Sequence, residues 1–460
     1  MSARNRELLA LVPASLLLTA GFAAVFIERD NVLSNVSLTF GGIFLGLCLA
    51  VHIVIRFTLP HADPYLFPLF AVLACFGLVM IYRIDENLAR EQAQWFVFGL
   101  ILFTATIILL RDYRVLERYR YTIAAGGIAL LLLPRVPGIG QNVNGAYLGV
   151  GIGPLSFQPA EFAKIAIIIF LASYLRDTRQ LLVTGGRKFL GITIPPLKHF
   201  GPLLLVWGVA MAMLFFIQDI GSSLMFFGGF LAVLYVATNR VSFVAIGLSL
   251  FAVGSWVLYN IRPTITNRID AWQHPFGPLY DKVGGSYQLA QSLFAQADGG
   301  LFGSGFGQSL LTVGTGGDKV VLLPAAQTDL IYSVITNELG LLGAAAVICT
   351  YLLAVERGFK IATLARDSFS KLLATGLTAV FALQVFVIVG GVTQVIPLTG
   401  VTLPFISYGG SSLIANFVII GLLLRISDET VARAEAPRAV ATARTATGGD
   451  AAAAAPPARR

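Results

Sequence analysis

Charged residues are scarce in this 460-residue sequence. Only 12% of the residues are Asp, Glu, Lys or Arg, whereas 56% are hydrophobic, and the mean hydropathy is +0.79. A water-soluble fold of this length cannot bury so much apolar side chain, so the chain must be solvated by lipid. The composition therefore excludes a soluble enzyme and predicts an integral membrane protein. We expect an all-α polytopic bundle, because a lipid-exposed backbone has to satisfy its own hydrogen bonds.

Residues that make disulfides or bind metals are also few. The three cysteines, Cys48, Cys75 and Cys349, are scattered through apolar runs, which predicts packing roles and no disulfide framework. The four histidines include no pair at a metal-ligand spacing. The net charge of +8 comes without a basic stripe interleaved with aromatic residues, so we expect no nucleic-acid partner.

Apolar runs of about twenty residues, the length that crosses a bilayer, recur along the chain. We expect about twelve transmembrane helices, near 6–27, 38–58, 65–83, 93–110, 120–136, 160–175, 198–218, 222–238, 241–260, 329–355, 370–392 and 402–426. The chain divides into two N-terminal helices (1–60), a main bundle (61–428) that includes a large polar loop (261–328), and a tail (429–460). The tail is rich in Ala, Pro, Thr and Arg, which predicts disorder.

Basic residues mark every second connection between these predicted spans. They are Arg4 and Arg6; Arg111, Arg114, Arg118 and Arg120; Arg176, Arg179, Arg187, Lys188 and Lys198; Arg240; and Arg357, Lys360, Arg366 and Lys371. By the positive-inside rule, this alternation predicts that both termini are cytoplasmic. The polar, glycine-rich connections, including the loop 261–328, then lie outside.

Ionisable residues within or beside the spans are costly in a bilayer and therefore informative. Glu161 and Lys164 are three residues apart, so they share a helix face. They either form a local ion pair at the helix start or offer an ammonium to an anionic head group. Asp219 lies at the outer end of a span, where it either caps the next helix or faces the external site.

Asp329 begins an apolar helix directly after the polar loop. Its simpler interpretation is a helix cap, since Asp is favoured there. Glu338 is nine residues further on, which on a regular helix means about 180° of rotation and about 13 Å of depth. The two carboxylates cannot face one substrate atom together. We therefore expect Glu338 to pair with a cation or hydroxyl inside the bundle.

The loop before Asp329 favours a functional interpretation of that residue. It mixes charged and aromatic side chains, and it contains the run GGLFGSGFGQS from Gly299 to Ser309. This run lacks the GK[ST] ending and the preceding strand of a nucleotide loop. Its free backbone N–H groups could still cradle a diphosphate.

Five separated motifs resemble the SEDS family of polytopic peptidoglycan polymerases, the rod-shape (RodA), division (FtsW) and sporulation (SpoVE) proteins. They are NGAYLGVGIGPLSFQPAEFAK from Asn144, QDIGSS from Gln218, GGSYQLAQSLFAQADGGLFGSGFGQS from Gly284, LPAAQTDLIYSVITNELG from Leu323, and PLTGVTLPFISYGGSS from Pro397. They occur in the family's order, and the resemblance covers about Pro64 to Arg425. The extra N-terminal pair of helices looks most like the actinobacterial rod-shape branch, which favours a role in elongation over division or sporulation.

The resemblance implies a peptidoglycan glycosyltransferase that polymerises lipid II on the outer face of the bacterial cytoplasmic membrane. It implies a class B penicillin-binding transpeptidase as partner, lipid II and undecaprenyl diphosphate as ligands, and no organic cofactor. The family's essential external aspartate falls on Asp329, which would act as general base on the acceptor's sugar hydroxyl. Lys164, a loop arginine or a divalent cation (Mg²⁺ or Mn²⁺) would stabilise the leaving diphosphate.

The resemblance also assigns a set of substrate-site residues. They are Glu161, Lys164, Asp219, Gln158, Asn144, Gln288, Ser292, Thr328, Ser407 and Glu338. Two places depart from the family pattern. Tyr147 and Leu148 stand where the family often has Arg-Trp, and Asn337 replaces the first glutamate of an EELG sequence.

Two other classes of function would also use a polytopic bundle. A flippase or transporter for lipid-linked precursors should show internal repeats and paired broken helices, and the sequence contains no convincing repeat. A non-catalytic membrane scaffold of the cell-wall machinery would have no need of Asp329.

Overall fold

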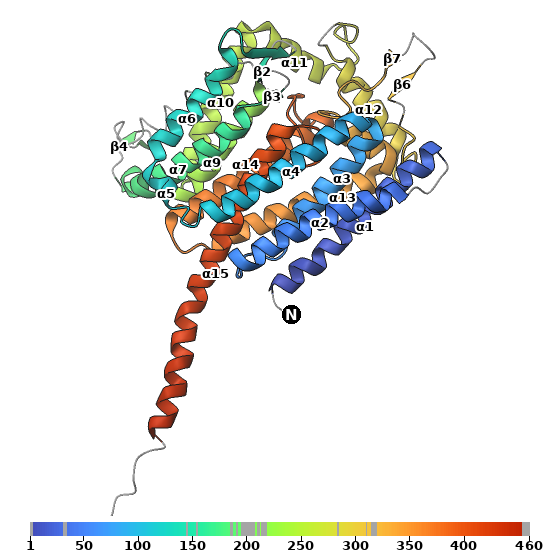
Figure 1. The fold of residues 1–460 in the computed structure, drawn as a ribbon. Helices are drawn as coiled ribbons and strands as arrows, with labels where there is room; N and C mark the ends of the chain where they lie inside the picture. Colours follow the sequence, from blue (N-terminus) through green and yellow to red (C-terminus); the bar gives the residue numbers. More distant parts are fainter. Residues whose placement is uncertain are drawn as a thin grey trace, which may run out of the picture.

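The computed structural model describes residues 3–30, 35–143, 146–152, 155–184, 187–189, 192–194, 208, 212, 219–282, 285–309, 311–313 and 320–452. Long helices packed side by side dominate it (Figure 1). The helices are α1 (Ala3–Asp30), α2 (Asn35–Thr58), α3 (Leu66–Ile84), α4 (Glu86–Leu109), α5 (Val115–Arg118), α6 (Arg120–Leu132), η1 (Leu133–Arg135), α7 (Ala160–Thr184), α9 (Ile220–Thr238), α10 (Val241–Ile261), α11 (Pro263–Gln273), α12 (Tyr287–Gly299), α13 (Ile331–Leu364), α14 (Ser368–Val392) and α15 (Gly410–Ala452).

The expected all-helical membrane architecture is confirmed. Within the described residues, nine helices are long and apolar enough to cross a bilayer. Helix α6 with η1, and helix α7, match two further predicted spans. The predicted span at 198–218 lies outside the described residues except for positions 208 and 212.

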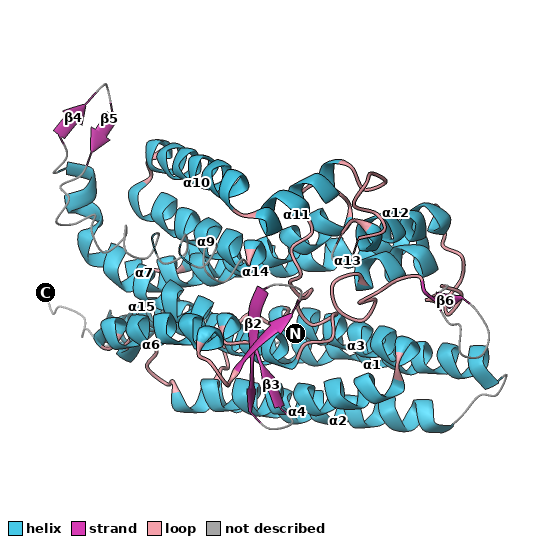
Figure 2. Cartoon of the chain, turned by 90° about the horizontal axis from the view of Figure 1, so that it is seen from above, coloured by secondary structure: helices cyan, strands magenta, loops and turns pink. Residues whose placement is uncertain are grey.

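Short strands form three small antiparallel sheets. They are β1 (Gly140–Val143), β2 (Ala146–Ile152) and β3 (Leu155–Phe157) in the order β1-β2-β3; β4 (Arg187–Phe189) with β5 (Ile192–Ile194); and β6 (Thr312–Val313) with β7 (Val320–Val321). In the first sheet, Val150 pairs with Gly140 on one side and Phe157 on the other. Seen from above, β2 and β3 lie over the helical bundle (Figure 2).

The two N-terminal helices dock on the bundle through buried polar groups as well as apolar packing. Helix α1 packs against α2 and α3, and α2 packs against α4. The carboxylate of Glu7 is paired with Arg4 and lies 2.9 Å from Nδ1 of His52, and Arg4 also donates to the carbonyl of Ala62. Buried polar groups need such partners, so this cluster fixes how the pair sits on the core.

Helix α13 is broken at Gly340, whose φ is +67°. The segment after α12 fills the break: Ser304 N donates to the carbonyl of Asn337 (2.9 Å), and Leu341 N donates to the carbonyl of Gly300 (3.0 Å). A Cβ on Gly340 would lie 2.4 Å from Gly303 N. The glycine-rich run therefore pairs with backbone groups that the break leaves without helical partners.

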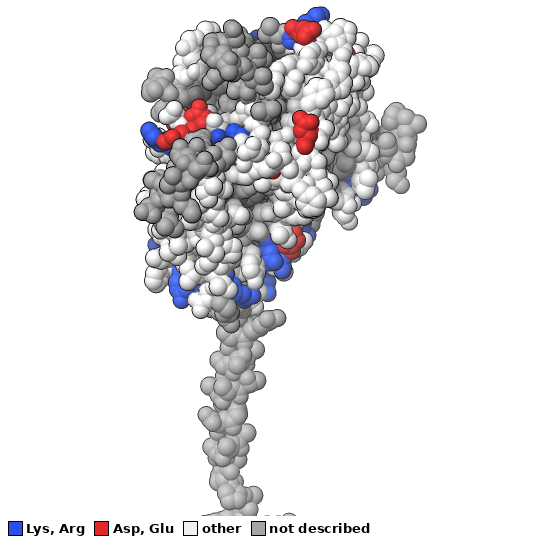
Figure 3. Space-filling view, turned by 90° about the vertical axis from the view of Figure 1, so that its right-hand side faces the viewer, with Lys and Arg blue, Asp and Glu red and all other residues white. Residues whose placement is uncertain are grey.

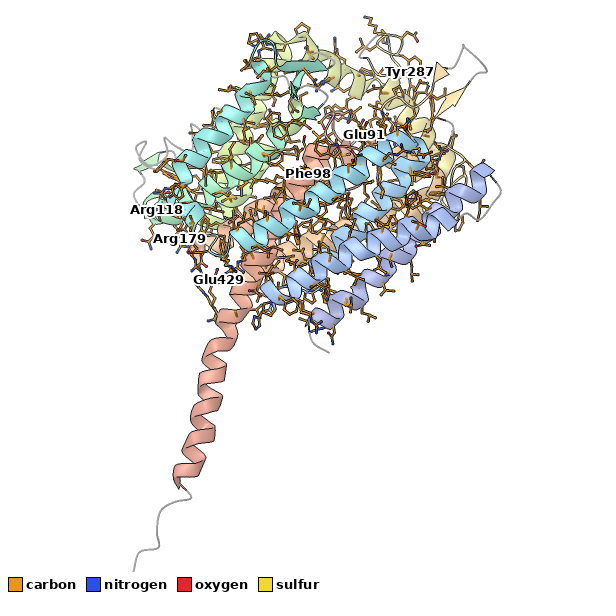
Figure 4. All side chains as sticks on the ribbon, in the orientation of Figure 1. Glu91, Phe98, Arg118, Arg179, Tyr287 and Glu429 are labelled. Atoms are coloured by element: carbon orange, nitrogen blue, oxygen red, sulfur yellow. The ribbon has the colours of Figure 1, made fainter. Side chains whose placement is uncertain are left out.

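The bundle has two chemically different ends. Lys and Arg gather towards the end from which α15 leaves, with a broad region of mostly uncharged residues above them (Figure 3). Arg118, Arg179 and Glu429 lie at that end, whereas Glu91 and Tyr287 lie towards the end that carries β2, α11 and α12 (Figure 4).

Three expectations need adjustment. The polar loop 261–328 contains two helices, α11 and α12. The stretch after Thr430 continues α15 as far as Ala452, because Ala and Arg favour helix strongly even where composition predicts disorder. Cys349 is exposed on the bundle surface, whereas Cys48 and Cys75 are buried as expected.

Candidate functional site

Asp329 lies in a tight turn that leads into α13. Ala325, at φ +55°, closes this turn, since its carbonyl accepts from the amides of Thr328 (3.1 Å) and Leu330 (3.2 Å). A second segment holds the turn from outside, because Ser407 Oγ donates to the carbonyl of Thr328 at 2.7 Å. Asp329 is thus placed by the hydrogen bonds of its own turn and by a side-chain hydrogen bond from Ser407, 79 residues further along the chain than Thr328.

The carboxylate of Asp329 does not cap the helix. Helix α13 begins at Ile331 with Leu330 at its N-cap and no side-chain cap. Among the described residues, the Asp329 carboxylate accepts no hydrogen bond. Burial raises its pKa to about 6, against the opposing effect of the Arg268 guanidinium. Gly400 approaches closely enough that a Cβ there would lie 3.6 Å from Asp329 Oδ2.

Asp219, in contrast, is a helix cap. Its carboxylate accepts from the amide of Ser222 at 3.0 Å, and its carbonyl accepts from Ser223 Oγ at 2.7 Å. Burial raises the pKa of Asp219, and Arg268 opposes that rise. Asp219 also lines the same cavity as Asp329, in addition to capping α9.

A cavity of about 1330 Å³ joins these residues. This exceeds the volume of about 300–1,000 Å³ that is usual for small-ligand sites, so it suits a larger ligand. Its charged lining residues are Glu91, Asp219, Asp281 and Asp329 with Arg268 and Lys282, and its aromatic lining residues are Trp95, Trp272, Tyr280, Tyr287 and Tyr408. Aromatic faces beside carboxylates are suited to sugar rings.

Three more predicted residues, Gln158, Gln288 and Thr328, line this cavity. Asn144 lies outside the described residues, as do the side chains of Tyr147 and Leu148. The structure therefore brings together Asp329, Asp219 and three of the expected polar residues.

Glu161 and Lys164 form a buried ion pair, with Nζ of Lys164 2.5 Å from Glu161 Oε2. Lys164 also donates to Gln384 Oε1 at 2.7 Å, and Gln384 Nε2 donates to Ser412 Oγ at 3.2 Å. Lys164 is only 2% exposed, and neither member of the pair is among the cavity-lining residues. Ser412 does line the cavity, so the pair reaches the wall through Gln384.

The remaining predicted residues lie away from the cavity lining. Ser292 shares a 2.7 Å hydrogen bond with Ser333, between α12 and α13. Glu338 lies 2.7 Å from Nε of Arg83 and accepts from the amide of Gly307 at 3.0 Å. The expectation that Glu338 pairs with a cation inside the bundle is confirmed.

Sequence reasoning missed Gln92 and Gln384, and it expected a loop arginine without saying which one. Gln92 is buried in α4, donating to the carbonyl of Ser407 (3.3 Å) and accepting from the amide of Gly409 (3.2 Å). A lone amide within an apolar span is the signal that could have found Gln384, whereas Gln92 lies in the polar stretch REQAQ and has no such signal. Arg268 was only one of several charges in the predicted loop.

A metal site is not preformed in the described part of the chain. No group of three or more His, Cys, Asp or Glu side chains there is arranged to hold an ion. Two carboxylates at the cavity are sheltered from solvent, the buried Asp219 and the half-buried Asp329. Mg²⁺ commonly binds through one or two carboxylates together with substrate phosphates. The donor set fits a cation that arrives with a phosphate ligand.

Comparison with known proteins adds independent findings. The profile of the cell cycle protein family FTSW_RODA_SPOVE matches residues 64–432. The peptidoglycan glycosyltransferase RodA of Mycobacterium tuberculosis is 39% identical over 92% of this chain and 90% of its own length, and that of Mycobacterium leprae is 40% identical with the same coverage. Stage V sporulation protein E of Bacillus subtilis is 31% identical over 77% of this chain and 94% of its own length.

Solved structures of similar proteins share the fold of this chain. A chain from a peptidoglycan synthase complex, described as coordinating polymerization and crosslinking, superposes with a TM-score of 0.63 at 26% identity, covering 80% of this chain and 98% of that one. The rod shape determining protein RodA of Thermus thermophilus superposes with a TM-score of 0.56 at 25% identity, covering 80% and 96%.

Proposed function

We propose a mechanism from one premise: the chain belongs to the FtsW, RodA and SpoVE family of cell cycle proteins. It is a multi-pass membrane protein and a peptidoglycan glycosyltransferase of cell-wall synthesis. Within that activity, we propose that the chain polymerises lipid II in the cavity and that Asp329 is the general base.

The proposed step is a direct glycosyl transfer. Asp329 takes the proton of the acceptor's sugar 4-hydroxyl while that oxygen forms a bond to C1 of the donor sugar. The bond between C1 and the diphosphate oxygen breaks, and its electron pair leaves with the diphosphate. A pKa of about 6 leaves Asp329 mostly ionised at neutral pH and still close to the working pH. A well-placed base contributes about 10²–10⁴-fold.

One observation carries this assignment. Asp329 lines the cavity and, among the described residues, its carboxylate accepts no hydrogen bond, although it stands where a helix cap would be expected. A carboxylate withheld from capping in a partly buried site is available to a substrate hydroxyl. The polyprenyl chains would remain in the apolar surroundings of the bundle, with the sugars in the cavity.

For Lys164 and Glu161 we propose support of the cavity wall. This differs from the leaving-group role that the family resemblance implies for Lys164. Its ammonium already bonds Glu161 and Gln384 and is removed from the cavity lining. Two of the three ammonium hydrogens of Lys164 are thus engaged with protein acceptors, and the side chain is only 2% exposed, which favours a structural role over contact with a departing phosphate.

We also propose an orientation in the membrane, in which both termini are cytoplasmic and the cavity opens to the outside. Two observations support it. Lys and Arg gather at the end from which α15 leaves, in line with the positive-inside rule, and the cavity residues Glu91 and Tyr287 lie towards the other end (Figures 3 and 4).

A class B penicillin-binding transpeptidase is the partner we propose. The support is the similarity to a chain of a peptidoglycan synthase complex in which polymerization and crosslinking are coordinated. We also propose elongation as the cellular role. The mycobacterial RodA proteins align with 92% of this chain, against 77% for the sporulation protein.

A divalent cation, Mg²⁺ or Mn²⁺, also forms part of the proposal. Asp329 or Asp219 would hold it together with the substrate's phosphate oxygens, and the ion would supply positive charge to the diphosphate. Chelation with EDTA followed by Mg²⁺ or Mn²⁺ addition tests this requirement: full polymerisation in EDTA would exclude it.

Polymerisation of labelled lipid II by the purified protein tests the proposed function, with and without the transpeptidase partner. We expect glycan strands from the wild type and essentially none from Asp329→Ala. Movement of lipid II across proteoliposome membranes without glycan product would favour a flippase. Full activity of a correctly folded Asp329→Ala variant would exclude Asp329 as the base.

A further inference from the structure

Arg268 is placed by the amphipathic helix α11. Ile265 and Ile269 on one face pack beside Leu258 and Ile220. Residues on a neighbouring face of the helix line the cavity, and they are Thr264, Asn267, Arg268, Ala271 and Trp272. This spacing of three and four residues is that of a single helix face. Arg268 therefore faces the cavity as a consequence of how α11 packs.

The guanidinium of Arg268 is incompletely satisfied. Its Nη1 atom is buried and has no hydrogen-bond partner among the described residues. A buried donor without a partner costs about 1–3 kcal/mol, more when it is charged, and such groups call for an explanation. The nearby carboxylates of Asp329 and Asp219 interact with it only through their charge.

Arg268 is also the less solvent-exposed of the two cations of this cavity. The described lining residues include four carboxylates and two cations, and the other cation, Lys282, is exposed. A diphosphate entering this lining would meet an excess of negative charge. A partly buried guanidinium is the side chain best suited to hold it, because its planar fork binds two phosphate oxygens at once.

A reciprocal clamp fixes α11 in this position. Trp272 Nε1 donates to the carbonyl of Gln394 at 2.9 Å, and Gln394 Nε2 donates to the carbonyl of Trp272 at 2.8 Å. Gln394 adopts a φ of +62° in the turn after α14. Trp272 is one helical turn from Arg268, so the clamp makes Trp272 and Gln394 positioning residues for the guanidinium.

Resting on the proposed function, we propose that Arg268 binds the diphosphate of the lipid-linked donor and stabilises it as it leaves. Arg268 keeps its protons throughout. The electron pair of the broken C1–O bond goes to the diphosphate, and the guanidinium neutralises the charge that develops there. In this proposal Asp329 acts on the acceptor hydroxyl, and Arg268 acts on the diphosphate that leaves the donor.

Substitution of Arg268 tests the proposal in the full-length protein with its partner. We expect Arg268→Ala to lower kcat about 10²–10³-fold, the usual effect of removing one such donor. Arg268→Lys should recover part of the activity, since it restores the charge without the fork. Lys360→Ala is the control. It removes an exposed cation that is not among the cavity-lining residues, and it should change kcat less than about threefold, because exposed charges contribute little.

A further measurement separates substrate contact from a structural role. Geranylgeranyl diphosphate, as an inhibitor of polymerisation, should need a concentration about tenfold or more higher against Arg268→Ala, since charged hydrogen bonds are lost. Unchanged inhibition would overturn the proposal.

Failure of this inference can be told apart from failure of the proposed function. Asp329→Asn should abolish polymerisation and leave inhibitor binding by Arg268 intact, measured as direct binding of geranylgeranyl diphosphate. If Asp329→Asn polymerises normally, the base assignment fails and the diphosphate result stands. If Arg268→Ala binds the probe like the wild type, the Arg268 assignment fails and the base assignment stands.

Discussion

Two pairs of opposite charge lie near the cavity of the bundle, and they differ in how many hydrogen-bond partners the protein gives them. Glu161 and Lys164 touch at 2.5 Å and share Gln384 as a further partner. Asp329 and Arg268 interact only through space, and each faces a cavity of about 1330 Å³. Both Glu161 oxygens and two of the three ammonium hydrogens of Lys164 have protein partners, whereas Nη1 of Arg268 and the Asp329 carboxylate have no hydrogen-bond partner among the described residues.

This difference gives a way to separate structural from chemical charges in a membrane protein. Both pairs look alike in sequence, because all four residues are ionisable groups beside apolar helices. A complete set of protein partners indicates a role in stability. A missing partner at a cavity wall indicates a role in binding or proton transfer.

The largest effect that we expect on stability comes from breaking the satisfied pair. Lys164→Met leaves the buried Glu161 carboxylate without its cation, which should cost about 3–5 kcal/mol of folding free energy. The double variant Glu161→Gln, Lys164→Met should recover much of this loss. Thermal unfolding in detergent measures both variants.

The same variants test whether Glu161 and Lys164 contact the substrate. Activity per folded molecule should stay within a few-fold of the wild type in the double variant, since neither residue lines the cavity. A hundredfold loss of polymerisation at unchanged stability would show that Lys164 meets the substrate after all.

An intermediate effect is expected at the break in α13. Gly340→Ala places a Cβ at 2.4 Å from Gly303 N in a backbone conformation with φ +67°. This strain should cost about 1–3 kcal/mol and disturb the segment that holds Glu338 against Arg83. Gly46→Ala is the control, because nothing lies within 4 Å of its added methyl group. Equal unfolding temperatures for the two variants would contradict the account of the break.

The smallest effect is a pH dependence set by the unsatisfied pair. Burial raises the pKa of Asp329 to about 6, and the base works only when ionised. Activity should therefore fall as the pH drops, by about tenfold between pH 7 and pH 5, following the ionised fraction of a single group. A flat kcat/KM profile over this range would show that no group with that pKa acts as base.

Much of the scaffold is predictable from the sequence, since the length and spacing of apolar runs place most spans. The contacts within the site are less predictable from the sequence. The pairing of Glu338 with Arg83 joins residues 255 positions apart, so sequence indicates a partner without identifying it. Asp329 has the residue type and the sequence position of a helix cap. Only the structure shows that the turn closed by Ala325 removes it from that role.

Arg268 illustrates the same limit. The segment that contains it is polar and was expected to be loop, so its residues could not be assigned to faces. Once Pro263–Gln273 forms a helix, the isoleucines turn inward and Arg268 turns to the cavity. The family resemblance points to Asp329 as the position of the essential aspartate. The cation near it, Arg268, is found only from the three-dimensional structure.

The most direct test of the account compares two aspartates of the same cavity. Asp329→Asn and Asp219→Asn each replace a carboxylate by an amide of nearly the same shape, and Asn can still cap α9 at position 219. We predict that lipid II polymerisation by Asp329→Asn falls about 10²–10⁴-fold, whereas Asp219→Asn keeps its rate within about tenfold. Polymerisation at the wild-type rate by folded Asp329→Asn, or the reverse order of the two variants, would contradict Asp329 as the general base.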